Sequence, residues 1–276
     1  MGEFDGRVVL ITGAARGQGR AHAVAFAEGG ADVVVVDVCA DIASVPYGLS
    51  AAGDLHDSAR FVEKTGRRAL AVEADVRDRA AMESVVAEAI AEFGKIDIVV
   101  ANAGICGFGP MPELTAEQWD DMLAVNLTGV FNTFRAVVPH MVEHGYGRLV
   151  AISSGAGKTG TPNLSHYAAT KWGVIGFVKS VALEVAANGV TANVVCPATV
   201  DTPMVHNAAL YSLFAPDIAE PTKENVRPRY EVMNPMHVAW LDPQDISNAV
   251  LFLASQRSAF ISGETIEVSA GGSAQR

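Results

Sequence analysis

The chain has 276 residues, of which half are apolar and 18% are charged, and its net charge is −11. This composition can bury a large core, and it excludes a disordered chain. The acidic balance and the lack of a basic run argue against nucleic acid or an anionic membrane surface as a partner. No apolar run approaches the ~20 residues that a membrane-spanning helix needs.

The first residues and the cysteines lead us to expect a cytoplasmic protein. Residues 1–15 have acids where a secretory signal needs a basic segment, and strand-like residues follow at once. Cys39, Cys106 and Cys196 are odd in number, widely spaced and without a Cys-x-x-Cys pair. We expect them to be reduced residues in or near the core, with neither a disulfide framework nor a metal site.

Short apolar runs rich in β-branched residues recur along the chain, separated by stretches of helical character. Runs that are apolar on both faces are typical of strands covered by helices on each side. Strands are predicted at 7–12, 32–37, 69–74, 96–101, 147–153, 190–196 and 265–268. Helices are predicted at 17–29, 54–66, 78–93, 115–144, 165–187 and 242–254. The alternation predicts one α/β domain over residues 1–276, with a doubly wound parallel sheet of the Rossmann type.

A long segment, 198–241, interrupts the alternation between the sixth strand and the last helix. It contains five prolines, and we expect it to be irregular. A segment of this kind in a compact domain is often a lid or a substrate-binding loop, and the alternative is a surface excursion. The residues in it that could line a pocket are Met204, Leu213, Phe214 and Trp240.

A glycine-rich turn joins the first strand to the first helix. It reads Thr12-Gly-Ala-Ala-Arg-Gly-Gln-Gly, so that glycines stand at 13, 17 and 19. Such glycines allow a tight turn, close approach of the backbone to a pyrophosphate, and close packing of helix on strand. The helix N-terminus adds free N–H groups for the phosphates. Because the turn follows a strand and opens a helix, it predicts a dinucleotide site formed by Gly13, Gly17 and Gly19.

Asp37 ends the second strand, 20 positions after Gly17. Its carboxylate can accept hydrogen bonds from the adenosine ribose, and it would repel a 2′-phosphate ~4 Å away by roughly 4 kcal/mol. Asp37 and the neighbouring Val38 therefore favour NAD over NADP. Arg16 is the opposing signal, since it could reach a 2′-phosphate, and Asp37 could instead be a solvated loop acid.

Residues 39–57 form an insertion directly after Asp37, at the sheet edge where dinucleotides lie. The apolar residues of this insertion exceed what a solvated bulge needs, and they are Ile42, Val45, Pro46, Tyr47 and Leu49. We expect the insertion to fold over the adenosine half of the cofactor and to slow its release. The alternative is a surface bulge.

Further motifs follow in order: Asp75-Val76, Asn102-Ala-Gly104, Asn126, Ser154, Tyr167-x-x-x-Lys171 and Pro197-Ala-Thr-Val-Asp-Thr202. With the glycine-rich turn they span nearly the whole chain. Their order and spacing resemble those of the short-chain dehydrogenase/reductase family. The resemblance implies an enzyme that moves a hydride between an alcohol carbon and a nicotinamide cofactor.

The chemistry supports the same catalytic residues independently. Oxidation of an alcohol requires loss of its O–H proton while hydride leaves the carbon, and a tyrosine with a pKa near 10 is a weak base at neutral pH. Lys171 lies one helical turn after Tyr167, so its charge should lower the pKa of that phenol. Ser154, after the fifth strand, can hold the substrate oxygen beside Tyr167.

The resemblance also implies roles for the other motif residues. Asn126 would anchor a water-linked proton relay to Lys171. Gln18 stands where the family usually has an apolar residue and could alter the hold on the pyrophosphate. The remaining cofactor contacts implied are Asp75 and Val76 at the adenine, Asn102, Ala103 and Gly104 along the cofactor, Tyr167 and Lys171 at the nicotinamide ribose, and Pro197, Val200 and Thr202 at the nicotinamide.

Residues 37–47, Gly66-Arg-Arg and the spelling of the glycine-rich turn resemble one branch of the family, the carveol dehydrogenase-like, mycofactocin-coupled dehydrogenases. This branch implies tightly held NAD, a hydrophobic, terpenoid-like secondary alcohol as substrate, and an external electron acceptor of the mycofactocin type. The family implies a homotetramer. The alternatives are a 3-oxoacyl reductase, a hydroxysteroid dehydrogenase, or a non-catalytic NAD-binding redox sensor. The complete set Asn126, Ser154, Tyr167 and Lys171 argues against a sensor.

Overall fold

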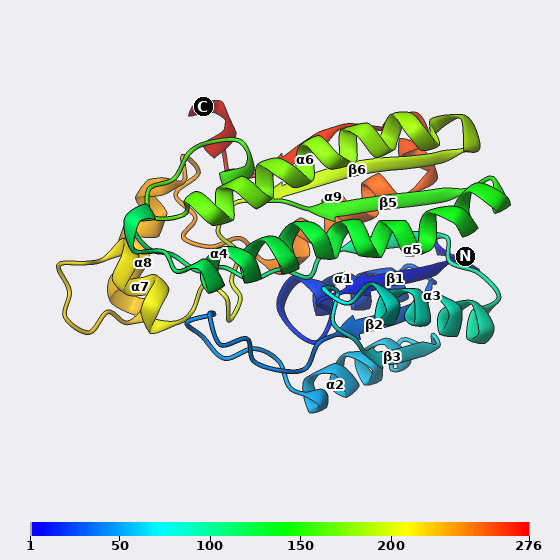
Figure 1. Cartoon of the computed structure of the whole chain (residues 1–276), viewed down its shortest axis with the longest axis horizontal. Coiled ribbons are helices and arrows are strands. Elements are labelled where there is room, and N and C mark those ends of the chain that lie inside the picture. The colour runs from blue at the N-terminus through cyan, green and yellow to red at the C-terminus, as the bar shows by residue number, and fades with distance from the viewer. Residues whose placement is uncertain (1, 276) are drawn as a thin grey trace.

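Seven parallel strands form one sheet in the order β3-β2-β1-β4-β5-β6-β7 in the computed structural model, which describes residues 2–275 (Figure 1). The chain runs outward from β1 to β3, crosses back to β4, and then continues to β7, so the strand order reverses between β1 and β4. A dinucleotide binds at such a switch point in this kind of sheet. The strands are β1 (Val8–Thr12), β2 (Asp32–Asp37), β3 (Ala69–Glu73), β4 (Ile98–Ala101), β5 (Gly147–Ile152), β6 (Val190–Pro197) and β7 (Thr265–Val268).

Helices cover both faces of the sheet, which confirms the predicted fold class. Successive strand residues point to opposite faces of the sheet and pack against different helices: Val9 contributes to the hydrophobic core on one face, and Leu10 to the core on the other. One layer holds α1 (Gly17–Glu28), α2 (Ala52–Glu63) and α9 (Pro243–Ala254). The other holds α3 (Arg79–Phe93), α5 (Gly129–His144) and α6 (Ser165–Val185). Every residue of β1 is buried, as its apolar sequence predicts.

The helix predicted at 115–144 is continuous, but it has three parts. These are α4 (Ala116–Leu123), a π-helical segment (Ala124–Thr128) and α5. The π segment contains Asn126, and insertions of this kind often mark functional sites because they re-aim a side chain. Single 3₁₀ turns complete the described elements at Met111–Glu113, Gly155–Gly157, Ala186–Asn188, Gln256–Ser258 and Gly272–Gln275.

Segment 198–241 is not irregular, so that prediction was wrong. It contains α7 (Ala208–Phe214) and α8 (Lys223–Met233). Asn207 and Thr222 cap the two helices by accepting hydrogen bonds from the backbone N–H groups of Leu210 and Asn225. The prolines obscured this pattern, because α8 tolerates Pro228 within it.

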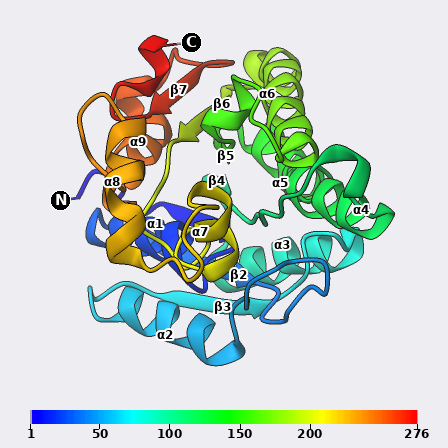
Figure 2. The ribbon, with the colours of Figure 1, turned by 90° about the vertical axis from the view of Figure 1, so that its left-hand side faces the viewer.

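The functional residues gather at one end of the sheet. The insertion follows the carboxyl end of β2, and α7 and α8 follow that of β6, so all three lie at the same end (Figure 1). Figure 2 looks onto this end and shows α7 near its middle. None of the helices in the described part of the chain is both long and apolar enough to cross a membrane.

Candidate active site

The glycine-rich turn is shaped by close contacts with the segment after β4. Gly13 has a φ of +65°, and a Cβ atom there would lie 2.7 Å from the Cα atom of Ala103. A Cβ atom on Gly19 would collide with the carbonyl oxygen of Gly13. The N-terminus of α1 has no side-chain cap and no acid in its first turn, so its N–H groups are open to a phosphate.

Asn102 stabilises the glycine-rich turn through hydrogen bonds. Its side-chain amide donates hydrogen bonds to the carbonyl oxygens of Thr12 and Gly13, at 3.0 and 3.1 Å. The hydroxyl of Thr12 in turn accepts bonds from the backbone N–H groups of Asn102 and Ala103, both at 3.1 Å. The residue predicted to lie along the cofactor therefore also fixes the phosphate-binding turn.

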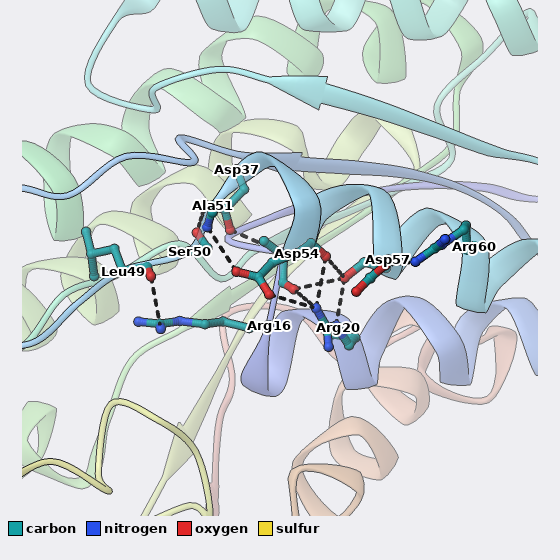
Figure 3. Close-up of polar contacts among 11 residues, drawn as sticks. Arg16, Arg20, Asp37, Leu49, Ser50, Ala51, Asp54, Asp57 and Arg60 are labelled. Atoms are coloured by element: carbon teal, nitrogen blue, oxygen red, sulfur yellow. Dashed lines mark hydrogen bonds and ion pairs between the residues drawn. The ribbon is translucent and has the colours of Figure 1, made fainter.

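Asp37 is buried at the end of β2 and points toward the glycine-rich turn. One carboxylate oxygen accepts a hydrogen bond from the backbone N–H of Ala15 at 3.0 Å. The other accepts from the Ser50 hydroxyl at 2.6 Å (Figure 3) and from the backbone N–H of Cys39 at 3.3 Å. The carboxylate is thus a fixed negative charge in the groove, and Asp37 is not a solvated loop acid.

Arg16 is turned to the insertion, although the sequence left it open as a phosphate ligand. Its guanidinium donates hydrogen bonds to the carbonyl oxygen of Gly48 at 2.7 Å and to that of Leu49 at 3.2 Å, and Figure 3 shows the bond to Leu49. Arg20 joins the same region by donating to the hydroxyl of Ser58 and to the carbonyl oxygen of Asp54, both at 2.9 Å. The two arginines therefore fasten the insertion and α2 to the start of α1.

The insertion is attached to the opposite wall of the groove as well. The hydroxyl of Tyr47 accepts a hydrogen bond from the backbone N–H of Cys106 at 3.0 Å. Ser44 donates to the carboxylate of Asp121 on α4 at 2.7 Å. The apolar side chains of the insertion form one hydrophobic cluster with side chains of the segment after β4 and of α4. This cluster includes Ile42, Val45, Ile105 and Met122. Residues 47–49 thus cross from one wall of the groove to the other.

The groove enclosed in this way collects most of the predicted cofactor residues. Its wall also includes Leu49, one of the apolar residues predicted to cover the cofactor, and Ser50, which the sequence did not single out. The predicted residues that line it are Gly13, Arg16, Gly17, Gln18, Asp37, Val38, Asp75, Val76, Asn102, Ala103, Gly104, Tyr167, Lys171 and Thr202. Of the other predicted cofactor residues, Gly19 packs closely against Gly13, and Pro197 and Val200 line a second cavity beside the groove.

Tyr167 and Lys171 lie on the same face of α6, one turn apart, with Lys171 buried and Tyr167 partly buried. The Nζ atom of Lys171 lies 5.5 Å from the centre of the Tyr167 ring and donates to the carbonyl oxygen of Ile152 at 3.0 Å. Ser154 follows β5, and its hydroxyl interacts with the phenol of Tyr167. The three predicted catalytic groups therefore meet at the end of the groove.

Asn126 joins them from the π segment. Its amide is completely buried, accepts a hydrogen bond from the N–H of Ile105 at 2.8 Å, and donates to the carbonyl oxygen of Ile105 at 2.9 Å. A Cβ atom on Gly104 would lie 3.3 Å from the Asn126 oxygen and 3.5 Å from the Lys171 nitrogen. The side chains of Asn126 and Lys171 therefore converge beside Gly104, although Asn126 lines neither cavity.

The pKa of Tyr167 differs from the sequence-based expectation. Burial raises it well above the usual value, and the Ser154 hydroxyl opposes the rise only in part. Burial also lowers the pKa of Lys171 to about 8. The ammonium lies over the face of the ring and is bonded to Ile152, so its charge does not outweigh the loss of water around the phenol.

A second cavity, of about 370 Å³, adjoins the groove. Five residues line both, and they mark where a reactant in the cavity would meet a cofactor in the groove: Gln18, Ser153, Tyr167, Thr202 and Met204. Met204 and Phe214 line the second cavity as predicted, whereas Leu213 and Trp240 belong to the small core of α7 and α8. Among its described lining residues none is charged.

Comparisons with known proteins agree with this geometry. A family model described as short chain dehydrogenase matches residues 7–210. The (−)-trans-carveol dehydrogenase of Rhodococcus erythropolis is 42% identical, over 98% of this chain and 99% of that protein. The chain belongs to the short-chain dehydrogenase family.

Two solved members of the short-chain dehydrogenase family share the fold closely. The carveol dehydrogenase of Mycobacterium avium in complex with NAD has a TM-score of 0.97 and 40% identity, covering 99% of this chain and 100% of that one. A short chain dehydrogenase of Mycobacterium paratuberculosis bound to NAD has a TM-score of 0.90 and 34% identity, with both chains fully covered. The predicted family and its carveol dehydrogenase-like character are therefore confirmed.

Several residues of the site were missed or misjudged from the sequence. Ser153 was not among the predicted site residues, yet it lines both cavities and donates to the carbonyl oxygen of Lys171 at 2.8 Å. Ser50 had no distinguishing motif, since its bond to Asp37 spans 13 positions. In residues 2–275, no group of three or more His, Cys, Asp or Glu side chains is arranged to hold a metal.

Proposed function

We propose that this short-chain dehydrogenase is an NAD-dependent oxidoreductase that interconverts a hydrophobic secondary alcohol and its ketone. The observation that carries the proposal is the position of Tyr167, which lines both the dinucleotide groove and the uncharged cavity beside it. A hydride donor in one compartment and an acceptor in the other would meet at this residue.

The chain's own residues account for the proton. Tyr167 accepts the alcohol proton as the general base, and Ser154 holds the alcohol oxygen next to the phenol. The side chains of Lys171 and Asn126 converge beside Gly104, where Asn126 would anchor a water-linked relay that carries the proton onward by way of Lys171. NAD, when bound, supplies the hydride acceptor and a positive ring charge that favours the ionised phenol of Tyr167.

The residues present fit NAD. The open N-terminus of α1 suits the pyrophosphate, and the fixed carboxylate of Asp37 suits ribose hydroxyls while repelling a 2′-phosphate. Arg16, the group that could favour NADP, is bonded to the insertion. The NAD-bound relative of Mycobacterium avium supports the same cofactor.

The second cavity favours a hydrophobic substrate. Its apolar wall includes Leu164, Val205, Leu210 and Phe214, and no charged residue among those described lines it. A carboxylate or phosphate on the substrate would therefore find no counter-charge. The relative that acts on carveol makes a terpenoid-like alcohol the first candidate.

The alternative enzymes are a 3-oxoacyl reductase and a hydroxysteroid dehydrogenase. Acyl-carrier substrates are disfavoured by the acidic balance of the chain and by Asp37, because a carrier reductase of this family needs a basic docking surface and NADP. A redox sensor without turnover would have no use for a Tyr167 placed between two cavities. A panel of terpene, steroid and other secondary alcohols distinguishes these functions.

We also propose that the insertion retains NAD. The strap formed by residues 47–49 is bonded to the glycine-rich turn through Arg16 and to the opposite wall through Tyr47, so dissociation of NAD requires at least one bond to break. Each tenfold decrease in the off-rate corresponds to about 1.4 kcal/mol. An enzyme that keeps its NAD needs an external electron acceptor, of the mycofactocin type in this branch.

The protein's assembly and location complete the proposal. Large apolar side chains are exposed on α4, α5 and α6, namely Trp119, Phe131, Trp172 and Leu183. We propose that these exposed side chains are buried between copies of the chain in a homotetramer. We also propose that the protein is cytoplasmic.

The deciding experiment starts with the purified protein. The mass of the nucleotide released on denaturation should be that of NAD, and secondary alcohols should be oxidised when a dye is present as electron acceptor. Replacing residues 40–53 with a tight turn should accelerate exchange and raise turnover with added NAD. A protein that purifies empty and turns over freely with NAD would refute retention, and one that oxidises no alcohol in the panel would refute the proposed reaction.

A further inference from the structure

The segment that carries α7 and α8 leaves and rejoins the sheet at one place. Val200 pairs with Leu241 in an isolated bridge, and the N–H of Asp201 donates to the carbonyl oxygen of Leu241 at 2.9 Å. Between these two points the segment packs around its own small core. One further backbone bond, from the N–H of Met236 to the carbonyl oxygen of Ala270 at 3.1 Å, lies beyond α8, so the tilt of α7 is left to be set by side chains.

His206 supplies such an attachment. Its Nε2 atom lies 2.5 Å from a carboxylate oxygen of Asp201, and its Nδ1 atom lies 2.6 Å from the hydroxyl of Tyr211 on α7. Lys223, the first residue of α8, donates to the same Asp201 oxygen at 3.1 Å. The imidazole ring also packs edge-on against Trp240, with 4.9 Å between the ring centres. Three parts of the segment thus meet at His206, and α8 joins them through the bond of Lys223 to Asp201.

The direction of these bonds follows from the groups themselves. A carboxylate only accepts, so Nε2 carries a proton and donates to Asp201. In the neutral imidazole Nδ1 then accepts from the hydroxyl of Tyr211. The hydrogen bonds that link Asp201, His206 and Tyr211 can all form only while α7 stays in its present position. Tyr211 is also buried.

The same segment forms the wall of the substrate cavity. Thr202 and Met204 lie between Asp201 and His206 in the chain and line both cavities. Leu210 and Phe214 lie on α7 around Tyr211 and line the substrate cavity. A change in the tilt of α7 would therefore alter the cavity without touching Tyr167 or the cofactor groove.

We propose that His206 is a positioning residue that fastens α7 to the loop carrying Thr202 and thereby holds the wall of the substrate cavity in place. This inference rests on the proposed function, because it concerns the affinity for the alcohol. His206 touches neither the reacting atoms nor the groove, so it acts through Asp201 and Tyr211.

The test uses two variants of the full-length protein. Tyr211→Phe removes one oxygen, and His206→Phe keeps a ring against Trp240 while removing both hydrogen bonds. The KM for the best alcohol of the panel should rise about three- to tenfold in each variant, with kcat and bound NAD unchanged. Adding Tyr211→Phe to His206→Phe should change KM little further, since both break the same chain. The matched control is Ser212→Ala, an exposed residue of α7 whose hydroxyl bonds only within the helix.

A second measurement does not depend on activity. Trypsin can cut after Lys223 and Arg229 in α8, and loosening of the segment should accelerate these cuts at least threefold in His206→Phe. An unchanged KM together with unchanged cleavage in this variant would overturn the proposal, as would an equal effect of Ser212→Ala. Should His206→Phe fail to fold, Tyr211→Phe alone decides by the same two readouts. If the protein oxidised no alcohol, the proposed function would fall, and the cleavage rates would still decide whether His206 fastens α7.

Discussion

The hydroxyl of Tyr47 and the backbone N–H of Cys106 form a 3.0 Å hydrogen bond across the cofactor groove, 59 positions apart in the sequence. Burial raises the pKa of Tyr47, so the phenol stays neutral and the bond persists over the physiological pH range. Two residues further on, the carbonyl oxygen of Leu49 is held by Arg16 on the other wall. The strap, residues 47–49, is therefore held by side-chain hydrogen bonds at two places, the bond of Tyr47 to Cys106 and the bonds of Arg16 to Gly48 and Leu49.

Tyr47→Phe should release NAD faster than the wild type. The variant keeps the ring but leaves the Cys106 N–H without its partner, and a lost hydrogen bond corresponds to about a three- to tenfold faster off-rate. Release is measured by diluting the purified protein into a trap for free NAD. Tyr146→Phe, at the start of β5 and far from the groove, is the control and should match the wild type. Equal off-rates for all three proteins would show that the strap does not retain NAD.

Tyr167→Phe should abolish turnover while NAD remains bound. The ring still fills its place in the groove, but the proton acceptor is gone, and loss of general base catalysis lowers kcat by at least ~10². Single-turnover reduction of bound NAD by a verified alcohol measures the chemical step directly. A variant that retained more than about a tenth of the wild-type kcat would exclude Tyr167 as the base.

Asp37→Asn should weaken the discrimination against NADP. The amide oxygen can still accept from Ala15 or Ser50, but the negative charge that repels a 2′-phosphate is removed. We expect the ratio of kcat/KM for NADP to that for NAD to rise at least about tenfold in protein stripped of nucleotide. Asp57→Asn on the exposed side of α2 should leave the ratio unchanged. A wild-type preference for NADP would contradict the role assigned to Asp37.

His22 should make the fold sensitive to acid. It is completely buried between α1 and α9, bonded to Ser247 at 2.8 Å, and burial lowers its pKa from 6.5 to about 3. The unfolded chain therefore binds one more proton than the folded chain between these values. Stability is fully present above pH 6.5 and falls as the pH drops toward 3.

Urea unfolding at several pH values between 7.5 and 4.5 tests this. The midpoint should fall more steeply with acid for the wild type than for His22→Gln, while the exposed-residue control His56→Gln should follow the wild type. Parallel curves for all three proteins would remove His22 as the cause.

The sequence predicted those features that local rules govern. The strands are apolar on both faces, and the glycine-rich turn, Asp37 and the Tyr167–Lys171 pair each follow from spacing within one or two elements. The apolar residues of the insertion also led to the prediction that it covers the groove, and in the structure Ile42, Tyr47 and Leu49 line that groove.

The remaining features depend on long-range packing. The bond of Arg16 to residues 48 and 49 and the bond of Ser50 to Asp37 join positions that no periodicity connects. The helices α7 and α8 were missed because the prolines of their segment, one of which is Pro228 within α8, resemble loop signals. The pKa of Tyr167 was misjudged because adjacency to Lys171 says nothing of how far burial removes water from the phenol.

The bridge between Val200 and Leu241 makes the intervening segment a self-contained cassette. Its two ends are neighbours on the sheet whatever lies between them, and the entropy of closing such a loop grows only slowly with its length. Residues around α7 and α8 can be gained, lost or exchanged while Thr202 and Met204, which line the groove, stay at the start of the cassette. Substrate range in this scaffold can therefore diversify by recombination of one contiguous stretch of gene, while the hydride-transfer machinery is inherited unchanged.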